Sequence, residues 1–181
     1  MRKWFRVMCL LSAAHVCVFA AADQARASDL IETAGTVLSI GLPVAAGGLT
    51  FSNDDGLGRL QLAASELATF GVTYGLKAVV DESRPDGGSQ SFPSAHTSVS
   101  FAAADFMRKR YGWEYGAPAF ALAGFVGYSR VEANRHHVHD VLAGAAIGIL
   151  AGELLTTQAE RLRVSVAATD DAAGIRLSYA W

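Results

Sequence analysis

The sequence predicts an all-α fold: a helical bundle of about five core helices with its functional site at one end, followed by a short C-terminal β-hairpin. Just over half of the 181 residues are hydrophobic and only 18% are charged, which suits helices buried in protein or in a membrane. The apolar segments are rich in Ala, Gly, Leu and Val, and three short polar clusters lie beside them.

Residues 1–27 have the three parts of a secretory signal peptide. A basic region, Arg2-Lys3-Arg6, precedes a mostly apolar stretch and then small residues. Two A-x-A sites follow, ending at Ala22 and Ala27, and we expect cleavage after Ala27 because a polar pair comes next. The alternative is an uncleaved first membrane helix with the same orientation. Both interpretations export the chain from a bacterial cytoplasm.

Cysteine content and charge exclude two broad classes of function. Both cysteines, Cys9 and Cys17, lie in the leader, so the mature chain has no disulfide and no cysteine metal site. Cleavage after Ala27 leaves 11 basic and 16 acidic residues, a formal charge of −5. This acidic balance argues against general nucleic-acid binding.

The first half of the chain predicts two helices and a loop. Residues 30–51 are apolar and Gly-rich, and we expect Pro43 to kink or break a helix there. A turn at 52–56 opens a second, long helix over 57–80. The polar, Gly-rich segment 81–92 then forms a loop.

The second half predicts three more helices. Pro93 suits the first turn of a helix that begins at Pro93-Ser94, runs to about Met107 and stops in the basic segment Arg108-Lys109-Arg110. Two apolar helices, over 117–128 and 137–158, flank the polar stretch 129–140. The helical domain therefore covers residues 28–160.

The tail, residues 161–181, has a different pattern. Apolar and polar residues alternate at 163–166 and at 175–179, and the turn-forming segment 170–174 lies between them. This pattern indicates a β-hairpin, although two strands alone are only marginally stable.

Two interpretations of the relation to a membrane stay open. Residues 117–128 and 141–155 are shorter than the about 20 apolar residues that a span needs. The segment 57–80 carries three charges. The alternation of helices nevertheless places the polar clusters on one side and the basic segment 108–110 on the other, which agrees with the positive-inside rule. An integral and a soluble periplasmic protein are equally supported.

The stretch Ser129–Asp140 (S-R-V-E-A-N-R-H-H-V-H-D) is the richest in chemistry. His136 and Asp140 are four residues apart, so on a helix they share a face. An aspartate so placed accepts the Nδ1 proton of the imidazole and leaves Nε2 free as a nucleophile or base. Such pairs also occur as structural hydrogen bonds, so the rest of the chain must supply partners.

A second cluster covers Lys77 to Pro85. Lys77 and Arg84 are seven residues apart, two helical turns, and project from one face. Pro85 keeps Arg84 out of helical geometry, so the arginine lies at the helix end and reaches outward. Taken alone, a solvated pair at a helix terminus is the plainer interpretation.

The third cluster is Ser91 to Thr97. A helix that starts near Pro93 leaves the N–H groups of Ser94 and Ala95 unpaired, which makes an anion site with the Ser94 hydroxyl beside it. His96 lies at the edge of this site. Taken alone, an ordinary N-cap with an exposed histidine has the same pattern.

Together the clusters match the needs of a tetrahedral oxyanion. Three cations, Lys77, Arg84 and Arg130, and the donors of a helix N-terminus would hold its oxygens. A histidine with an aspartate supplies a nucleophile, and a second histidine supplies a proton. Phosphoryl transfer needs mainly this positioning and charge stabilisation.

The same residues carry a family resemblance. The motifs Lys77-x6-Arg84-Pro85, Pro93-Ser94-Ala95-His96 and Ser129-Arg130-x5-His136-x3-Asp140 resemble the three-part signature of the type 2 phosphatidic acid phosphatases. Bacterial class A acid phosphatases and vanadium haloperoxidases share this signature. The helices around it, over residues 57–155, also resemble the core of that family.

The resemblance implies a role for each residue. His136 attacks phosphorus and forms a phosphohistidine, and Asp140 orients it. His96 protonates the leaving oxygen and then activates water. The phosphate oxygens are held by Lys77, Arg84, Ser94, Arg130 and the backbone amide of Ala95. The resemblance implies no metal and no cofactor.

Three features depart from the signature or lie outside it. The family usually has glycine at the position of Ala95, which would impair activity if the site required a positive φ. The loop 86–92 is short and leaves little room for a lid. His137 and His139 form an H-x-H pair, a pattern that can bind metal, but the family does not use them, and we expect them at the rim.

The sequence thus predicts a metal-independent, exported phosphatase, at the periplasm or the periplasmic face of the inner membrane. Its apolar surroundings favour a phosphomonoester or pyrophosphate of a lipid. Three alternatives stay open: a non-specific acid phosphatase on soluble esters, a vanadate-dependent haloperoxidase, and a non-catalytic envelope protein. The sequence does not give the oligomeric state.

Overall fold

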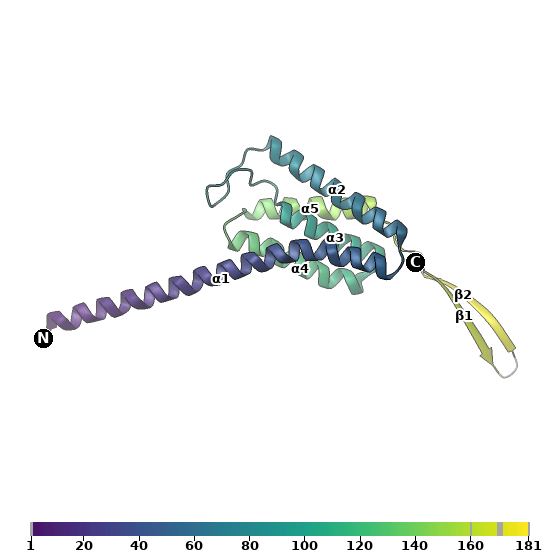
Figure 1. The fold of residues 1–181 in the computed structure, drawn as a ribbon, viewed down its shortest axis with the longest axis horizontal. Coiled ribbons are helices and arrows are strands. Elements are labelled where there is room, and N and C mark those ends of the chain that lie inside the picture. Colours follow the sequence, from purple (N-terminus) through teal and green to yellow (C-terminus); the bar gives the residue numbers. More distant parts are fainter. Residues whose placement is uncertain (1, 160, 170–171, 181) are drawn as a thin grey trace.

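The computed structural model describes the backbone of residues 2–159, 161–169 and 172–180, and the side chains of residues 27–159. In this part of the chain five helices precede an antiparallel pair of strands (Figure 1), which confirms the predicted all-α bundle. The elements are α1 Arg2–Ser52, α2 Gly56–Val79, α3 Ala95–Tyr111, α4 Trp113–Glu132, α5 Val138–Leu155, β1 Arg161–Thr169 and β2 Ala172–Ala180.

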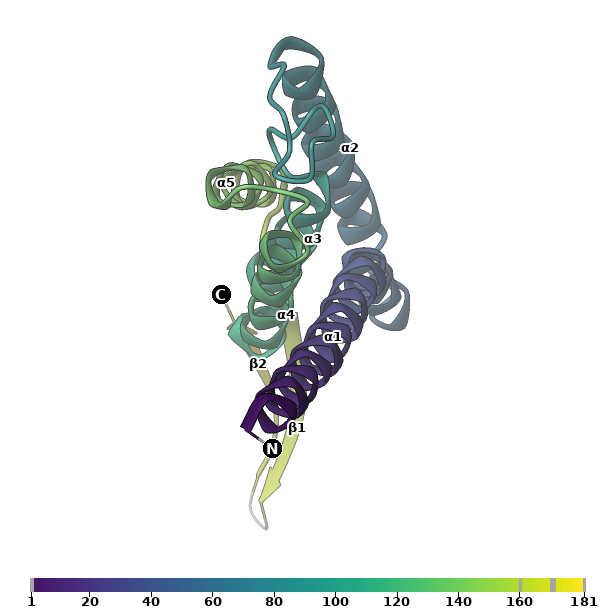
Figure 2. The ribbon, with the colours of Figure 1, turned by 90° about the vertical axis from the view of Figure 1, so that its left-hand side faces the viewer.

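Helix α3 is the centre of the bundle. It contacts each of the other four helices, and the end-on view in Figure 2 shows it between α2, α4 and α5. Its Phe106 is fully buried, in a core that includes Leu42 of α1, Leu62 of α2 and Ala123 of α4. Because α3 is covered on several sides, small residues such as Ala and Ser replace the usual polar face of a surface helix.

Three glycines bring α5 close to α3. Gly144, Gly148 and Gly152 recur every four residues on the buried face of α5. A Cβ atom at Gly148 would lie 2.2 Å from the carbonyl oxygen of Ser98, so no larger residue fits. Small residues at this spacing let two helix backbones approach closely. Asp140, one turn before Gly144, is thereby held against the N-terminus of α3.

Helix α1 passes through Pro43 without the expected break. A proline inside a helix removes one hydrogen bond and costs about 3 kcal/mol. Leu42 and Ala46, on either side of it, are buried in the core, and their burial offsets that cost. Upstream, α1 continues as one helix to Arg2, and Figure 1 shows its N-terminal half extending past the rest of the bundle.

The other helix boundaries differ from the predicted ones by a few residues. Helix α3 continues through the basic segment 108–110 and ends at Tyr111, and the next residue, Gly112, caps it with a φ of +100° that suits glycine. Helix α4 begins at Trp113, before the predicted start at 117, and includes Pro118. Helix α5 ends at Leu155 rather than at 158.

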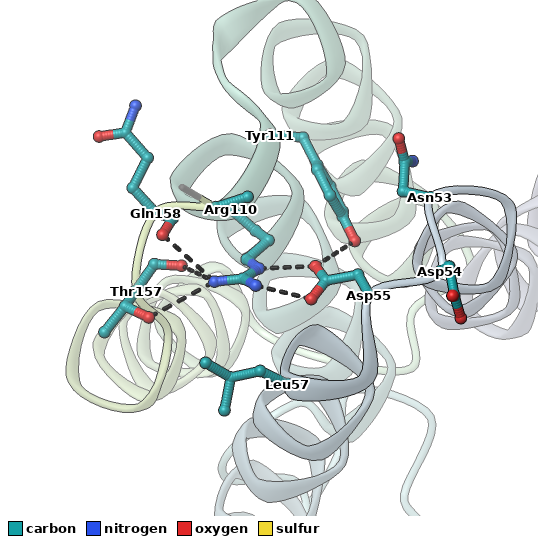
Figure 3. A pocket seen from close by; sticks show the side chains of 9 residues that line it. Asn53, Asp54, Asp55, Leu57, Arg110, Tyr111, Thr157 and Gln158 are labelled. Carbon is teal, nitrogen blue, oxygen red and sulfur yellow. Dashed lines mark hydrogen bonds and ion pairs between the residues drawn. The ribbon is translucent and has the colours of Figure 1, made fainter. Parts of the chain in front are cut away.

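A buried ion pair fastens the end of the bundle opposite the predicted site (Figure 3). Arg110 Nη2 lies 2.6 Å from Asp55 Oδ1, and Tyr111 donates a 2.8 Å hydrogen bond to Asp55 Oδ2. Arg110 Nη1 also donates to the carbonyl oxygen of Thr157 at 2.9 Å. These contacts join the α1–α2 turn, the end of α3 and the segment after α5, and they line a cavity of about 580 Å³.

Within residues 27–159, two segments are long and apolar enough to cross a membrane. They are Ala27–Ser52, with a mean hydropathy of 1.5, and Val138–Leu155, with 1.6. Little more than a quarter of either window is buried in the bundle. The sequence alone predicts that residues 141–155 are too short to span a membrane. The second of the two segments begins three residues earlier, at Val138, and is therefore long enough. Their exposed large apolar residues include Leu30, Val37, Ile40, Val44, Phe51, Leu142, Leu150 and Leu154.

The tail forms the predicted type of element. Strands β1 and β2 pair antiparallel from Arg161 opposite Ala180 to Thr169 opposite Ala172. The turn at 170–171 and the predicted alternation of side chains lie outside the residues and side chains that the structure describes.

Candidate active site

The three polar clusters meet at one end of the bundle. Lys77 lies in the last turn of α2, the segment 81–92 links α2 to α3, and residues 133–137 link α4 to α5. These two connections lie at the left-hand end of the bundle in Figure 1, which faces the viewer in Figure 2. The eight residues predicted for the site are therefore gathered at this end: Lys77, Arg84, Ser94, Ala95, His96, Arg130, His136 and Asp140.

His136 lies before α5, not on it. The prediction that His136 and Asp140 share a helix face assumed that both residues are helical. That assumption is wrong, because α5 begins at Val138. The His136 N–H donates to the carbonyl oxygen of Arg130 at 3.2 Å, which fixes the connection. The imidazole Nδ1 lies 3.4 Å from Asp140 Oδ2, and the side chain is 4% exposed. Nε2 is therefore the nitrogen left for chemistry.

Asp140 joins three parts of the site. It is fully buried, and its Oδ2 accepts hydrogen bonds from the His137 N–H at 2.8 Å and from the Ser91 hydroxyl at 2.5 Å. Its own carbonyl oxygen accepts the Ser94 N–H at 3.0 Å. The first turn of α5, the loop 81–92 and the start of α3 are held together through this one residue.

The start of α3 retains the features of an anion site, with one correction. The Ser94 N–H, which we expected to be free, is paired with Asp140, and the Ser94 hydroxyl lies 2.9 Å from that of Thr97. The N–H groups of Ala95 and His96 have no protein acceptor among residues 27–159. Both belong to the first turn, where the helix dipole favours an anion.

Alanine at position 95 fits the backbone that it adopts. Ala95 is the first residue of α3 and lies in the helical region, so its methyl group meets no positive φ. The structure thereby removes the part of the doubt that concerned φ, whereas the expectation that the methyl group faces the site stays a prediction.

The loop 81–92 contacts one of the predicted cations, Lys77 of α2, and contains another, Arg84. Lys77 is buried, and its Nζ donates to the carbonyl oxygens of Gln90 at 2.7 Å and Ser91 at 3.2 Å. Gln90 has a φ of +56°, a conformation that costs energy in a residue other than glycine. Arg84 Nε is buried and makes no hydrogen bond within residues 27–159, so it is available to a ligand.

The third cation, Arg130, is held by α1. Its Nε donates to the Ser129 hydroxyl at 3.1 Å, and its Nη2 donates to the carbonyl oxygen of Glu32. The Glu32 carboxylate also accepts from Arg135 Nε at 2.8 Å, and Arg135 Nη1 donates to Asp86 Oδ2 at 3.0 Å. Arg135 therefore bridges α1 and the loop 81–92 at the mouth of the site.

The charges at the site act on its two histidines. Burial, together with the positive charges of Lys77 and Arg84, lowers the pKa of His136 to about 4, so its imidazole is neutral at neutral pH. Burial, together with Arg130 and Arg84, also lowers the pKa of His96. A neutral imidazole beside cationic and N–H donors is suited to attack an anionic phosphorus centre.

Sequence reasoning missed four residues of this region: Glu32, Glu82, Asp86 and Ser91. Each meets a partner at least 49 residues away in the chain. No local spacing links such partners, and only the positions of Glu82 and Ser91 within the polar loop could have drawn attention to them.

Fold and site together define an all-α protein in which three cations, two histidines and the N-terminus of α3 gather at one end of the bundle. The chain belongs to the PAP2 superfamily, whose family model matches residues 59–163. The resemblance to the type 2 phosphatidic acid phosphatases that the three motifs indicate is thereby confirmed.

Two curated relatives are named as phosphatases of lipid A. The chain is 35% identical over 130 residues to a lipid A 4'-phosphatase of Helicobacter pylori strain J99. The match covers 65% of this chain and 65% of that protein. It is 47% identical over 76 residues to a lipid A 1-phosphatase of Porphyromonas gingivalis, which covers 39% of this chain and 17% of that protein. In both cases the match spans less than two thirds of the relative.

Two solved structures share the fold. A transmembrane PAP2-type phosphatidylglycerolphosphate phosphatase from Bacillus subtilis superposes with a TM-score of 0.57 at 27% identity, over 76% of this chain and 84% of that one. LpxE from Aquifex aeolicus superposes with a TM-score of 0.54 at 20% identity, over 70% of this chain and 92% of that one. The second likeness concerns the fold alone.

Proposed function

We propose that this chain is a membrane-associated lipid phosphatase that cleaves a phosphomonoester or pyrophosphate through a phosphohistidine at His136, without a metal ion. One arrangement carries the proposal: Asp140 faces His136 Nδ1, and the same residue anchors the N-terminus of α3. The carboxylate thus holds the nucleophile beside an anion site built from backbone N–H groups.

In the first step His136 Nε2 attacks phosphorus, and the bond between phosphorus and the leaving oxygen breaks. His96 gives its proton to that oxygen, so the dephosphorylated lipid leaves as a neutral alcohol or a shorter phosphate. The cations Lys77, Arg84 and Arg130, with the Ser94 hydroxyl and the Ala95 N–H, stabilise the charge on the three remaining oxygens.

In the second step water replaces the imidazole. The neutral His96 takes a proton from a water molecule, and the hydroxide attacks phosphorus while the P–N bond breaks. Inorganic phosphate leaves, His136 is neutral again, and His96 keeps the proton for the next turnover. Each proton and bond is accounted for by the two histidines and one water.

A lipid substrate fits both the surface and the relatives. The exposed apolar side chains of α1 and α5 would face lipid, and the relatives described above are named for phosphate groups on lipids. Lipid A, phosphatidylglycerophosphate and phosphatidate are therefore the substrates to test first. The short loop 86–92 adds no further pocket for a large headgroup.

We infer that the site faces the periplasm and that residues 1–27 do not share one membrane crossing with the rest of α1. A helix of 51 residues is about 76 Å long, more than twice the about 30 Å of hydrocarbon in a bilayer. The leader is then either removed or crosses separately, and Ala27–Ser52 returns from the site end toward the cytoplasm.

The basic segment at the opposite end supports this orientation. Arg108 and Lys109 pair with Glu153, and Arg110 pairs with Asp55. Acidic partners contribute little to the orientation rule, so the segment still favours the cytoplasmic side. A reporter fused after Trp181 tests the topology: alkaline phosphatase should be inactive there, and a green fluorescent protein should fluoresce. The reverse result would indicate either an inverted bundle with its site in the cytoplasm or a soluble periplasmic protein. Carbonate extraction separates these two, because it releases a soluble or peripheral protein and leaves an integral one in the membrane pellet.

A phosphate-release screen of purified protein, with EDTA present, tests the activity. We expect turnover of lipid phosphates in mixed micelles, weaker turnover of p-nitrophenyl phosphate, and inhibition by vanadate. Preference for the soluble ester would favour a non-specific acid phosphatase. Complete loss in EDTA, with recovery in Mg²⁺, would defeat the metal-free mechanism, and vanadate-dependent bromination of a phenol dye would indicate a haloperoxidase.

A further inference from the structure

Four side chains with metal-ligating atoms meet beside the proposed nucleophile. They are Glu82 from the loop 81–92 and His137, His139 and Asp140 from the start of α5. Their ligand atoms all lie within 4.8 Å of one another. The proposed phosphatase mechanism uses Asp140 but none of the other three.

The spacing of these atoms suits a tetrahedral ion. Glu82 Oε1 lies 2.7 Å from His139 Nε2 and 3.4 Å from His137 Nδ1. Asp140 Oδ1 lies 3.2 Å from His139 Nε2, and Asp140 Oδ2 lies 3.5 Å from His137 Nδ1. Tetrahedral Zn²⁺ with bonds of about 2.0–2.1 Å separates its ligands by about 3.3 Å. The separation of Glu82 from His137 and that of Asp140 Oδ1 from His139 match this value. The separation of Glu82 from His139 needs a small outward shift of Glu82, and the 3.5 Å separation concerns Asp140 Oδ2, the oxygen that faces His136.

One of these atoms has no hydrogen-bond partner. Asp140 is fully buried, yet its Oδ1 makes no hydrogen bond within residues 27–159. A buried polar atom without a partner costs free energy, and a bound cation would remove that cost.

The two histidine rings are already arranged side by side. The imidazoles of His137 and His139 stack with centroids 5.1 Å apart and planes 9° from parallel. Stacking lets His137 Nδ1 and His139 Nε2 both face the Glu82 carboxylate. The ligand set is therefore largely in place before an ion arrives.

We propose that Glu82, His137, His139 and Asp140 form a binding site for Zn²⁺ or a similar transition-metal ion, and that its occupation inhibits the enzyme. Two imidazole nitrogens favour Zn²⁺ over Mg²⁺ or Ca²⁺, which prefer oxygen ligands. The inhibition follows from Asp140, which is shared: once its charge is committed to the ion, it no longer orients and stabilises His136. The inhibition rests on the proposed function, whereas the binding does not.

Binding is tested directly on the full chain, purified in detergent with a tag that lacks histidine and freed of metal with EDTA before dialysis. Calorimetry with Zn²⁺ should show one site, and Co²⁺ should give the intense visible bands of tetrahedral coordination. Glu82→Gln and His139→Ala should each weaken Zn²⁺ binding about tenfold or more. The matched control, Asp81→Asn, changes an exposed neighbour outside the cluster and should leave the affinity unchanged.

Activity gives the second readout. Saturating Zn²⁺ should lower phosphate release by the wild type about tenfold or more, because the histidine loses its carboxylate partner. His139→Ala should keep the metal-free activity and resist the inhibition. Equal Zn²⁺ affinity in wild type and variants would overturn the site, and Zn²⁺ bound without inhibition would overturn its effect. Zn²⁺ binding that depends on Glu82, in a protein inactive on every phosphate ester, would instead defeat the proposed function and leave the site standing.

Discussion

The Ser91 hydroxyl donates a 2.5 Å hydrogen bond to Asp140 Oδ2, the same oxygen that lies 3.4 Å from His136 Nδ1. The serine belongs to the loop 81–92 and the aspartate to α5, so the bond joins two elements across the site. It helps to hold the carboxylate beside the proposed nucleophile.

Ser91→Ala should therefore slow turnover without weakening substrate binding. A hydrogen bond to a charged group is worth about 1.5–3 kcal/mol, so we expect kcat to fall about tenfold or more while KM stays nearly constant. Ser91→Thr keeps the hydroxyl and should recover most of the rate. If both variants lost activity and thermal stability together, Ser91 would have only a structural role.

The assignment of the nucleophile predicts unequal effects within one short segment. His136→Ala should abolish turnover and leave the fold intact, whereas His137→Ala and His139→Ala should retain most of the activity in the absence of metal. A phosphorylated His136 should accumulate in His96→Ala, where hydrolysis is slow, and alkaline quenching with mass spectrometry would detect it. An inactive His137→Ala beside an active His136→Ala would show that the register is wrong.

The lowered pKa of His96 predicts where activity is lost as the pH rises. The general acid must be protonated, and burial with the charges of Arg130 and Arg84 shifts its deprotonation below the ordinary value of 6.5. The falling limb of kcat/KM should therefore lie below pH 6.5. NMR titration of labelled histidine, assigned with His96→Ala, measures this directly, and a midpoint above 7 would contradict it.

The glycines of α5 predict a steric effect that a control can isolate. A Cβ at Gly148 would meet the Ser98 carbonyl oxygen at 2.2 Å, so Gly148→Ala must push α5 away from α3. We expect about 2 kcal/mol of lost stability, seen as a lower Tm in detergent, together with lower activity. Gly124→Ala, on α4 with no atom within 4 Å of the new methyl group, should be neutral or slightly stabilising. Equal behaviour of the two variants would argue against close α3–α5 packing.

The ion pair at the far end predicts acid sensitivity. The Arg110 guanidinium lowers the pKa of Asp55 to about 2, so the pair stabilises the fold fully above the ordinary carboxyl pKa of 3.8 and less as the pH falls toward 2. Asp55→Asn should cost roughly 3 kcal/mol near neutral pH and flatten this acid dependence. Asp54→Asn, at an exposed neighbouring position, is the matched control and should leave the thermal unfolding profile unchanged.

Local patterns predicted much of the fold. Apolar periodicity located the five helices of the described part of the chain, and residue types at fixed spacings selected eight residues that the structure gathers at one end of the bundle. Two local predictions failed for different reasons. Pro43 does not interrupt α1 because Leu42 and Ala46, on either side of it, are buried by tertiary packing. His136 lies outside α5 because a local capping bond, from the His137 N–H to the Asp140 carboxylate, starts the helix after it.

The residues that hold the site residues in place could not be predicted, because each lies far from its partner in the chain. Glu32 meets Arg130 across 98 residues, and Glu82 meets His139 across 57. A single sequence offers no spacing rule for such pairs, because they depend on how whole helices pack. For the same reason the sequence alone did not indicate a role for His137 and His139, because their partner Glu82 lies in the distant loop 81–92.

The glycine contacts of α5 also decide which half of the pocket can be redesigned. With no free volume between α5 and α3, the wall that carries Asp140 and the α3 N-terminus cannot accept new side chains. On the other side of the site, the part of α1 around Glu32 and the loop 81–92 are joined by surface contacts such as those of Arg135. Libraries that aim to change headgroup preference should therefore vary residues 86–90 and the first turns after Ala27, and keep α5 as it is.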